Sequence, residues 1–248
     1  MRIPLPTDYT VYRFLVPSLG VEKKFRPFTV KENKALLTAQ SVDDHDVMMD
    51  TLKLIIGNCC LEEIDVDQLA LFDAEYLLIK LRSISIGKES SLILMCPDPH
   101  DGHPEQTRQN EVFVDLDNIE IVGLDKYKTS VRLSDSMMVE MNPPTLDLIK
   151  KLQQVPSDAT YEQRYDIAIT NIRHLMKAIV TEDEVIKVNE CGVQDIREWL
   201  ESLTEDSFEL LHSQIQNIPY CRIKLDWVCP FCGKRNVRYL EGLSYFFY

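Results

Sequence analysis

Apolar residues recur every three or four positions between residues 25 and 90, which is the period of an amphipathic helix. A first helix should begin near residue 30, because Thr29 and Glu32 have the spacing of a capping box. A second should follow the acidic turn SVDDHD, and a third should start around Asp73 and stop at Gly87. We therefore predict an N-terminal helical part over residues 25–90.

The pattern changes to alternation of apolar and polar residues between positions 91 and 142, which is typical of strands with one buried face. Five short segments carry this alternation, and they read SLILMC, EVFVDL, NIEIVGL, KTSVRL and SMMVEM. Consecutive short strands favour an antiparallel β meander, which Pro143 and Pro144 should end.

Helical spacing returns between residues 143 and 218, beginning with TLDLIKKLQQ. The longest apolar stripe runs from Tyr161 to Ile179 and predicts one long helix that faces the core. EVIKVN is a candidate short strand, and two further helices are expected around residues 193–202 and 205–216. CRIKLDWVC is predicted to be a strand that leads into the C-terminal segment.

These patterns predict an α+β fold in which helical bundle layers surround a small antiparallel β meander, with a zinc-ribbon-like strand pair at the C-terminus. Three prolines among scattered apolar residues near the start favour an extended arm. The predicted parts are an extended N-terminal arm (1–24), a helical part (25–90), a β meander with the first half of a metal site (91–142), a second helical part (143–218), and a zinc knuckle with an aromatic tail (219–248).

Composition excludes several functional classes. The net charge of −13 repels phosphate backbones and argues against nucleic acid as a partner. No apolar run approaches the ~18 residues of a membrane span, and the first ten residues lack the features of a signal peptide, so we expect a cytosolic protein without a membrane partner. Seven cysteines, an odd number, are then expected to be buried thiols or metal ligands and not a disulfide framework.

Cys229 and Cys232 belong to a Cys-x-x-Cys-Gly motif, the form of a zinc knuckle, in which the glycine allows a tight turn around the thiolates. A redox motif of the thioredoxin type is the alternative, but it needs a helix and a βαβ setting that the pattern lacks. Because zinc prefers four ligands, this motif supplies only half of a site.

The other half is predicted in LMCPDPHDGHPE, where Cys96 precedes two histidines, His100 and His103. Cys96 with either histidine would complete a Cys₃His site for one zinc ion. All four positions would then be filled by the protein, so the zinc should be structural and not catalytic. The alternatives are solvated loop histidines and a buried thiol at Cys96.

No motif of a nucleophilic, phosphate-binding or metalloprotease site occurs, so we predict neither an enzyme nor a small-molecule substrate. The aromatic tail LEGLSYFFY is the other segment of interest, because several large apolar side chains are costly to leave in water. Packing on the protein's own helices would satisfy them. The alternative is that Phe247 and Tyr248 reach a neighbouring protein, and we take these two as candidate partner-binding residues.

Several segments, taken in order, resemble the T4-type bacteriophage baseplate family, and they are KKFRPFTVKENKALLTA, LFDAEYLLIKLRSISIG, MNPPTLDLI, IPYCRIKLDWVCPFCG and LEGLSYFF. The match covers most of the chain from about residue 22 onward. It departs from the pattern in the loop at 96–110, where histidines stand in place of an expected second cysteine. The resemblance therefore leaves the identity of the fourth ligand open, with His100 and His103 as the candidates.

The resemblance implies a non-enzymatic role in building the tail baseplate of a contractile phage, as a hub subunit or as an assembly factor acting on the hub. Its partners would be other baseplate hub or tail proteins. It would work in the host cytoplasm during assembly, with retention in the virion tail as an open alternative. A different class of function is a zinc-ribbon adaptor that binds nucleic acid or a polymerase through basic residues around Lys234 and Arg235.

Overall fold

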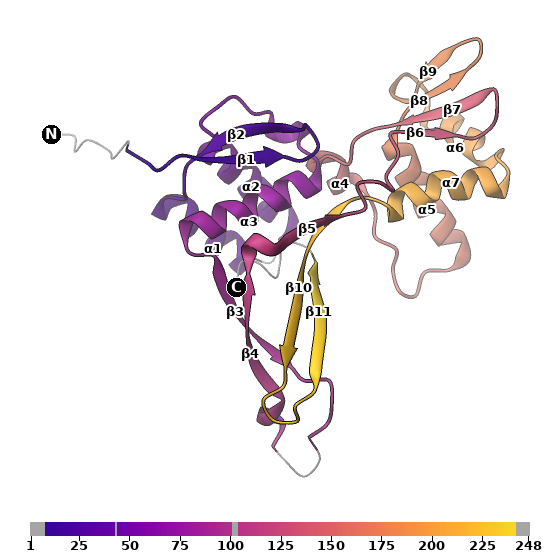
Figure 1. Cartoon of the computed structure of the whole chain (residues 1–248). Helices are drawn as coiled ribbons and strands as arrows, with labels where there is room; N and C mark the ends of the chain where they lie inside the picture. The colour runs from indigo at the N-terminus through magenta and orange to yellow at the C-terminus, as the bar shows by residue number, and fades with distance from the viewer. Residues whose placement is uncertain (1–7, 43, 101–103, 242–248) are drawn as a thin grey trace. The chain divides into compact units, whose positions relative to one another are not determined.

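The computed structural model describes residues 8–42, 44–100 and 104–241, and it confirms a mixed α+β architecture (Figure 1). Contacts divide the chain into two compact units. The first unit combines the N-terminal elements and Phe72–Val122 with the C-terminal strands, and the second contains Asp67–Leu71 and Gly123–Pro219.

The strands in the described ranges are β1 (Tyr12–Val16), β2 (Val21–Phe25), β3 (Glu89–Met95), β4 (Gln109–Asp115), β5 (Ile119–Val122), β6 (Ser130–Arg132), β7 (Met137–Met141), β8 (Met176–Thr181), β9 (Val185–Lys187), β10 (Tyr220–Val228) and β11 (Arg235–Glu241). The α-helices are α1 (Val30–Val42), α2 (His45–Cys59), α3 (Leu71–Ser85), α4 (Leu146–Lys151), α5 (Tyr161–Leu175), α6 (Val193–Glu201) and α7 (Glu205–Gln216). Short 3₁₀ turns are η1 (Val66–Gln68), η2 (Glu105–Arg108), η3 (Leu116–Asn118) and η4 (Val188–Glu190).

Helix α3 forms the centre of the first unit. Ten of its fifteen residues are buried, charged ones among them, because the helix packs against neighbours on most of its sides. Leu77, Leu78 and Leu81 on α3 are fully buried, as are Leu52 and Ile56 on α2. The three helices predicted between residues 25 and 90 are confirmed as α1, α2 and α3.

Strands β1 and β2 form an antiparallel hairpin with Tyr12 opposite Phe25. The sequence predicted an extended arm over residues 1–24, but the described part of that segment folds as this hairpin. Alternating Tyr12, Phe14 and Val16 place aromatic and aliphatic side chains on one side of β1, and Phe14 packs against Phe25. Gly20 closes the turn at a φ of 64°, where a residue with a side chain would be strained.

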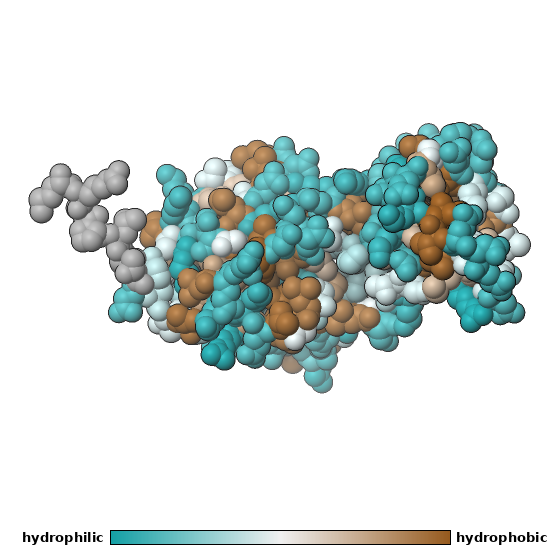
Figure 2. Space-filling view, turned by 90° about the horizontal axis from the view of Figure 1, so that it is seen from above, coloured by the Kyte–Doolittle hydropathy of each residue, from teal (hydrophilic) through white to brown (hydrophobic). Residues whose placement is uncertain are grey.

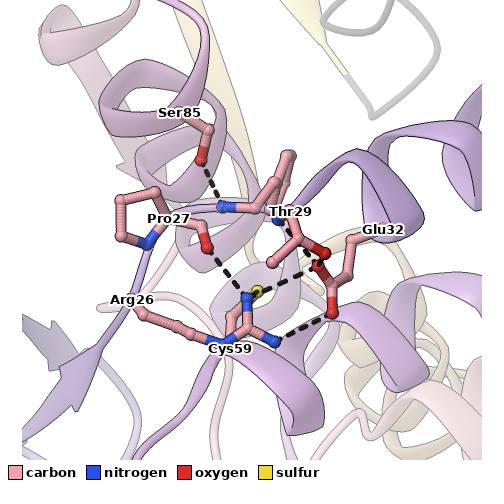
Figure 3. A network of polar contacts seen from close by, with 7 residues as sticks. Arg26, Pro27, Thr29, Glu32, Cys59 and Ser85 are labelled. Carbon is pink, nitrogen blue, oxygen red and sulfur yellow. Dashed lines mark hydrogen bonds and ion pairs between the residues drawn. The ribbon is translucent and has the colours of Figure 1, made fainter. Parts of the chain in front are cut away.

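The start of α1 is held by a polar network between the hairpin and the helices (Figure 3). Arg26 donates from Nη2 to Glu32 Oε1 at 2.8 Å and from Nη1 to the Pro27 carbonyl at 2.9 Å. The Thr29 backbone N–H donates to Glu32 Oε2 at 2.7 Å, which is one of the two bonds of the predicted capping box. The Phe28 N–H donates to Ser85 Oγ, so the network also reaches α3.

Two β-ribbons extend side by side from the helices of the first unit (Figure 1). One is the two-stranded β3-β4 pair, and the other is β10-β11, to which β5 adds a third strand in the order β11-β10-β5. β10 lies against β4. Side chains buried on the two ribbons include Leu94, Val112, Val114, Ile223, Leu225 and Leu240.

The second unit has a four-stranded antiparallel sheet, β6-β7-β8-β9, whose core is shared with α5, α6 and α7. Ile172 and Leu175 of α5, Val139 of β7 and Leu211 of α7 lie in this core. The predicted helix through Ile179 is wrong beyond Leu175, because Met176–Thr181 is strand β8. The β-branched run Ile-Val-Thr favours a strand, which the 3.6-residue spacing alone could not reveal.

The prediction that residues 91–142 form one β meander is also wrong, because the strands of this segment do not form a single sheet. All five of its strands exist, but they are divided among three sheets and both units. β5 pairs with β10 from the far end of the chain, and β7 pairs with β8. Local alternation identifies a strand but carries no information about its partner.

Apolar residues are also exposed among hydrophilic ones on the surface of both units (Figure 2). Such residues are ordinary when they are scattered, so only a grouped set calls for an explanation. No helix in the described part of the chain has the length and apolarity needed to cross a bilayer.

Candidate metal centre

The loop between β10 and β11 is a tight knuckle. The Cys229 N–H donates to the Lys234 carbonyl at 2.8 Å, and the Gly233 N–H donates to the Cys229 carbonyl at 2.9 Å. Gly233 has a φ of 74°, in the left-handed region that favours glycine. The turn therefore holds Cys229 and Cys232 on the same side of the loop.

The segment after β3 provides the facing half. Cys96 follows the last residue of β3, and its N–H donates to the Arg108 carbonyl at 2.7 Å. Arg108 Nε donates back to the Cys96 carbonyl at 3.0 Å. This reciprocal pair fixes the backbone of Cys96, and the chain then returns toward the cluster with His100.

Four ligand atoms converge where the two ribbons meet. One ligand atom from each of Cys96, His100, Cys229 and Cys232 lies within 4.8 Å of the other three. The Cys96 and Cys232 sulfurs are 3.8 Å apart, and Cys229 Sγ is 3.7 Å from His100 Nε2. Tetrahedral zinc would place two sulfurs about 3.8 Å apart and a sulfur and a nitrogen about 3.6 Å apart. The donor set and its spacing therefore suit a tetrahedral metal ion.

The same distances exclude a disulfide at this place. A disulfide needs an S–S separation of about 2.0 Å, and every cysteine in the described ranges is a free thiol. Cys96, Cys229 and His100 are buried, whereas Cys232 is exposed. A metal ion bound here would have four protein ligands and one thiolate at the surface.

Two neighbouring contacts brace the cluster. The His100 ring stacks on Phe231 with centroids 4.6 Å apart and an interplanar angle of 24°, which orients the imidazole. Lys234 Nζ forms an ion pair with the Asp98 carboxylate, and this pair joins the two halves a second time. The sequence pattern did not reveal Phe231 or Asp98 as neighbours of the cluster, and it marked Lys234 only as a basic residue of the adaptor alternative. Asp98 and Lys234 could have been found, because each stands two positions after a cluster cysteine and their charges are opposite.

The backbone also affects the thiols. The Cys232 N–H lowers the pKa of the Cys229 thiol, and the Phe231 N–H acts in the same direction. The pKa of Cys232 is raised. The Lys234 N–H acts to lower it, but desolvation and the neighbouring sulfurs of Cys229 and Cys96 outweigh that bond. Crowded sulfurs thus resist joint ionisation unless a cation lies among them.

The predicted site residues have different outcomes. Cys96, His100, Cys229 and Cys232 are brought together, and their role as metal ligands stays a prediction. His103, the alternative histidine, lies outside the described residues. The candidate partner-binding residues Phe247 and Tyr248 also lie outside them.

Fold and cluster together define a mixed α+β protein with a Cys₃His group that could hold a metal ion. The chain belongs to the T4 bacteriophage base plate protein family, whose sequence model matches residues 9–248. The family resemblance inferred from the sequence is thereby confirmed. Comparison with curated proteins gave no match, and comparison with solved structures gave none.

Proposed function

We propose that this protein is a non-enzymatic component in the building of the phage tail baseplate, either a hub subunit or an assembly factor that acts on the hub. Its family membership carries the proposal. It acts through protein–protein contacts in the host cytoplasm during assembly, and retention in the virion tail is compatible with the same role. Other hub or tail proteins are its partners.

The proposal includes one structural zinc ion, bound by Cys96, His100, Cys229 and Cys232. The support is the near-tetrahedral spacing of three sulfurs and one imidazole nitrogen between two ribbons. The cysteines come from segments more than a hundred residues apart in the chain, so a shared ion would cross-link β3-β4 to β10-β11. A rigid ribbon pair would present a fixed surface to partners.

Elemental analysis of protein purified without chelator should give about one zinc per chain. Cys229→Ser should lose the metal, because a hydroxyl is a poor substitute for a thiolate. Cys191→Ser is the matched control, since Cys191 lies in the second unit, away from the cluster, and should keep full metal. Metal-free wild-type protein together with an unperturbed Cys229→Ser variant would contradict the zinc site.

The fourth ligand is tested with the two histidines. His100→Ala should lose metal and His103→Ala should keep it, because His100 Nε2 points at the Cys229 sulfur. Full metal in both variants would mean that neither imidazole is required.

The aromatic tail is assigned a partner-binding role as part of the same proposal. The segment from Leu243 to Tyr248 contains five large apolar residues in six positions. We expect Phe247 and Tyr248 to contact a hub protein, so deleting these two residues should leave the melting temperature nearly unchanged and abolish hub assembly. A truncated protein that melts many degrees lower would place the tail in the protein's own core.

The adaptor alternative is weakened by the charges around the knuckle. Arg235 is paired with Asp226, Arg222 with Glu120, and Lys234 with Asp98. These basic groups are already neutralised by neighbours, which leaves little free positive charge for phosphates. Salt-sensitive binding of nucleic acid in a mobility shift at physiological salt would revive the alternative.

A further inference from the structure

The outward face of the β3-β4 ribbon has an unusual composition. Register and alternation place four residue pairs on this face, and they are Glu89 with Asp115, Ser91 with Phe113, Ile93 with Glu111, and Met95 with Gln109. All eight are exposed or partly exposed, while Leu94, Val112 and Val114 on the opposite face are buried. We call these eight residues the outer ribbon face.

Large apolar side chains are open to solvent on this face. Ile93 is 72% exposed, Phe113 is 67% exposed and Met95 is 41% exposed. Phe113 and Ile93 are diagonal neighbours across the two strands, so they form one group and are not scattered. An exposed aromatic and aliphatic group on a two-stranded ribbon is typical of an interaction site.

The charges on the outer ribbon face all have one sign. Glu89, Glu111 and Asp115 are acidic, and no lysine or arginine belongs to the face. Glu89 and Glu111 form no ion pair with any residue that the structure describes. The face therefore carries three negative charges beside three apolar residues, and it lacks an internal counter-charge.

We propose that the outer ribbon face binds another protein of the baseplate through an apolar surface framed by lysine and arginine. The inference rests on the proposed baseplate role. Apolar contact at the centre with charge complementarity at the rim gives both affinity and orientation. Nucleic acid does not fit, because an acidic face repels phosphates.

A second copy of this chain is a poorer occupant than a basic partner. The chain has a net charge of −13, so copies repel one another. The exposed side of β10-β11 is the place where basic residues gather, but Arg222 pairs with Glu120 and Arg235 pairs with Asp226. A different, basic protein is therefore the better match for Glu89 and Glu111.

The test uses the phage that encodes the chain, with Phe113→Ser and Glu111→Lys made separately. Each should reduce the yield of complete baseplates at least tenfold, while the purified variants keep wild-type melting temperature and metal content. Asp183→Lys is the matched charge control, because Asp183 is an exposed turn residue in the second unit, and it should assemble normally. Revertants of Glu111→Lys should carry lysine or arginine changed to an acidic residue in another tail protein.

Wild-type yields from both variants would overturn the inference. Revertants that map to β10 or β11 of this same chain would overturn it in favour of a second copy as the occupant. A deletion of the whole gene distinguishes a failure of the binding surface from a failure of the proposed function. If the deletion blocks baseplate assembly but the variants of the outer ribbon face do not, only the assignment of this face as a binding surface fails. If the deletion leaves baseplates normal, the proposed function and the inference both fail.

Discussion

Glu32 is a buried carboxylate that is kept ionised by the hydrogen-bond donors around it. Burial alone would raise its pKa, but hydrogen bonds from Arg26 and from Thr29 outweigh that effect and hold the pKa at about 2. The usual value is 4.5, so the folded protein favours the ionised form. A depressed pKa means that this group stabilises the fold above about pH 4.5 and loses that contribution as the pH falls toward 2.

Glu32→Gln should lower the free energy of unfolding by roughly 1–3 kcal/mol at pH 7, because it replaces charge-assisted hydrogen bonds with neutral ones. The difference from the wild type should shrink as the pH falls from 4.5 and should vanish near pH 2. Denaturant unfolding at several pH values measures it. Glu182→Gln, at an exposed turn, is the control, and its free energy of unfolding should equal that of the wild type at every pH. Equal stability of Glu32→Gln and wild type at pH 7 would contradict this account.

Helix α3 and strand β10 are joined by a second buried carboxylate, whose pKa is raised and not lowered. Glu75 on α3 accepts a hydrogen bond from the Cys221 N–H on β10 at 2.8 Å. Burial raises its pKa to about 7, and the hydrogen bonds from the backbone and the side chain of Cys221 offset only part of the desolvation. A raised carboxyl pKa means that stability is full below about pH 4.5 and falls as the pH rises to 7.

Glu75→Gln should therefore become more stable than the wild type as the pH rises, by up to ~3 kcal/mol at pH 8. Gln retains an oxygen that can accept from Cys221 but carries no buried charge. The measurement is the difference in unfolding free energy between the two proteins from pH 4 to pH 8. A difference that stays constant across that range would show that Glu75 is not the group that titrates.

Most elements were predictable from local patterns, whereas their pairing was not. The strands within residues 91–142 were found because alternation is a property of a few neighbouring positions. The pairing of β5 with β10 joins residues about a hundred positions apart, and no local pattern encodes it. The end of α5 was missed because the apolar residues of β8 happen to continue the helical spacing.

The candidate site was more predictable than the sheets. Cysteine and histidine are rare in this chain, so two clusters stand out, and the ligand count of zinc suggests joining them. The choice between His100 and His103 depends on which imidazole faces Cys229 in the folded loop, and it stays a prediction, because His100 Nε2 lies beside Cys229 Sγ and His103 is outside the described residues. Phe231 was missed because stacking on a histidine has no signature in sequence spacing.

At the scale of the whole molecule, each compact unit has a core of its own. The core of the second unit is made by its sheet and by α5, α6 and α7. All four residues of the Cys₃His cluster lie in the first unit, at the ends of its ribbons. Metal removal should therefore affect the two units differently, and a single melting temperature would hide that difference.

Chelation should release the ribbons of the first unit while the helices of the second stay protected. Without a cation the clustered thiols must reprotonate and separate. The two ribbons then lose the cross-link through the metal and are held together only by their own small apolar core. We expect amide hydrogen exchange to accelerate at least tenfold in β3, β4, β10 and β11 and to stay unchanged in α5 and α7. Cys229→Ser should reproduce this pattern without chelator, and Cys191→Ser should not. Unchanged exchange in β10 and β11 after complete metal removal would mean that packing alone holds the ribbons together.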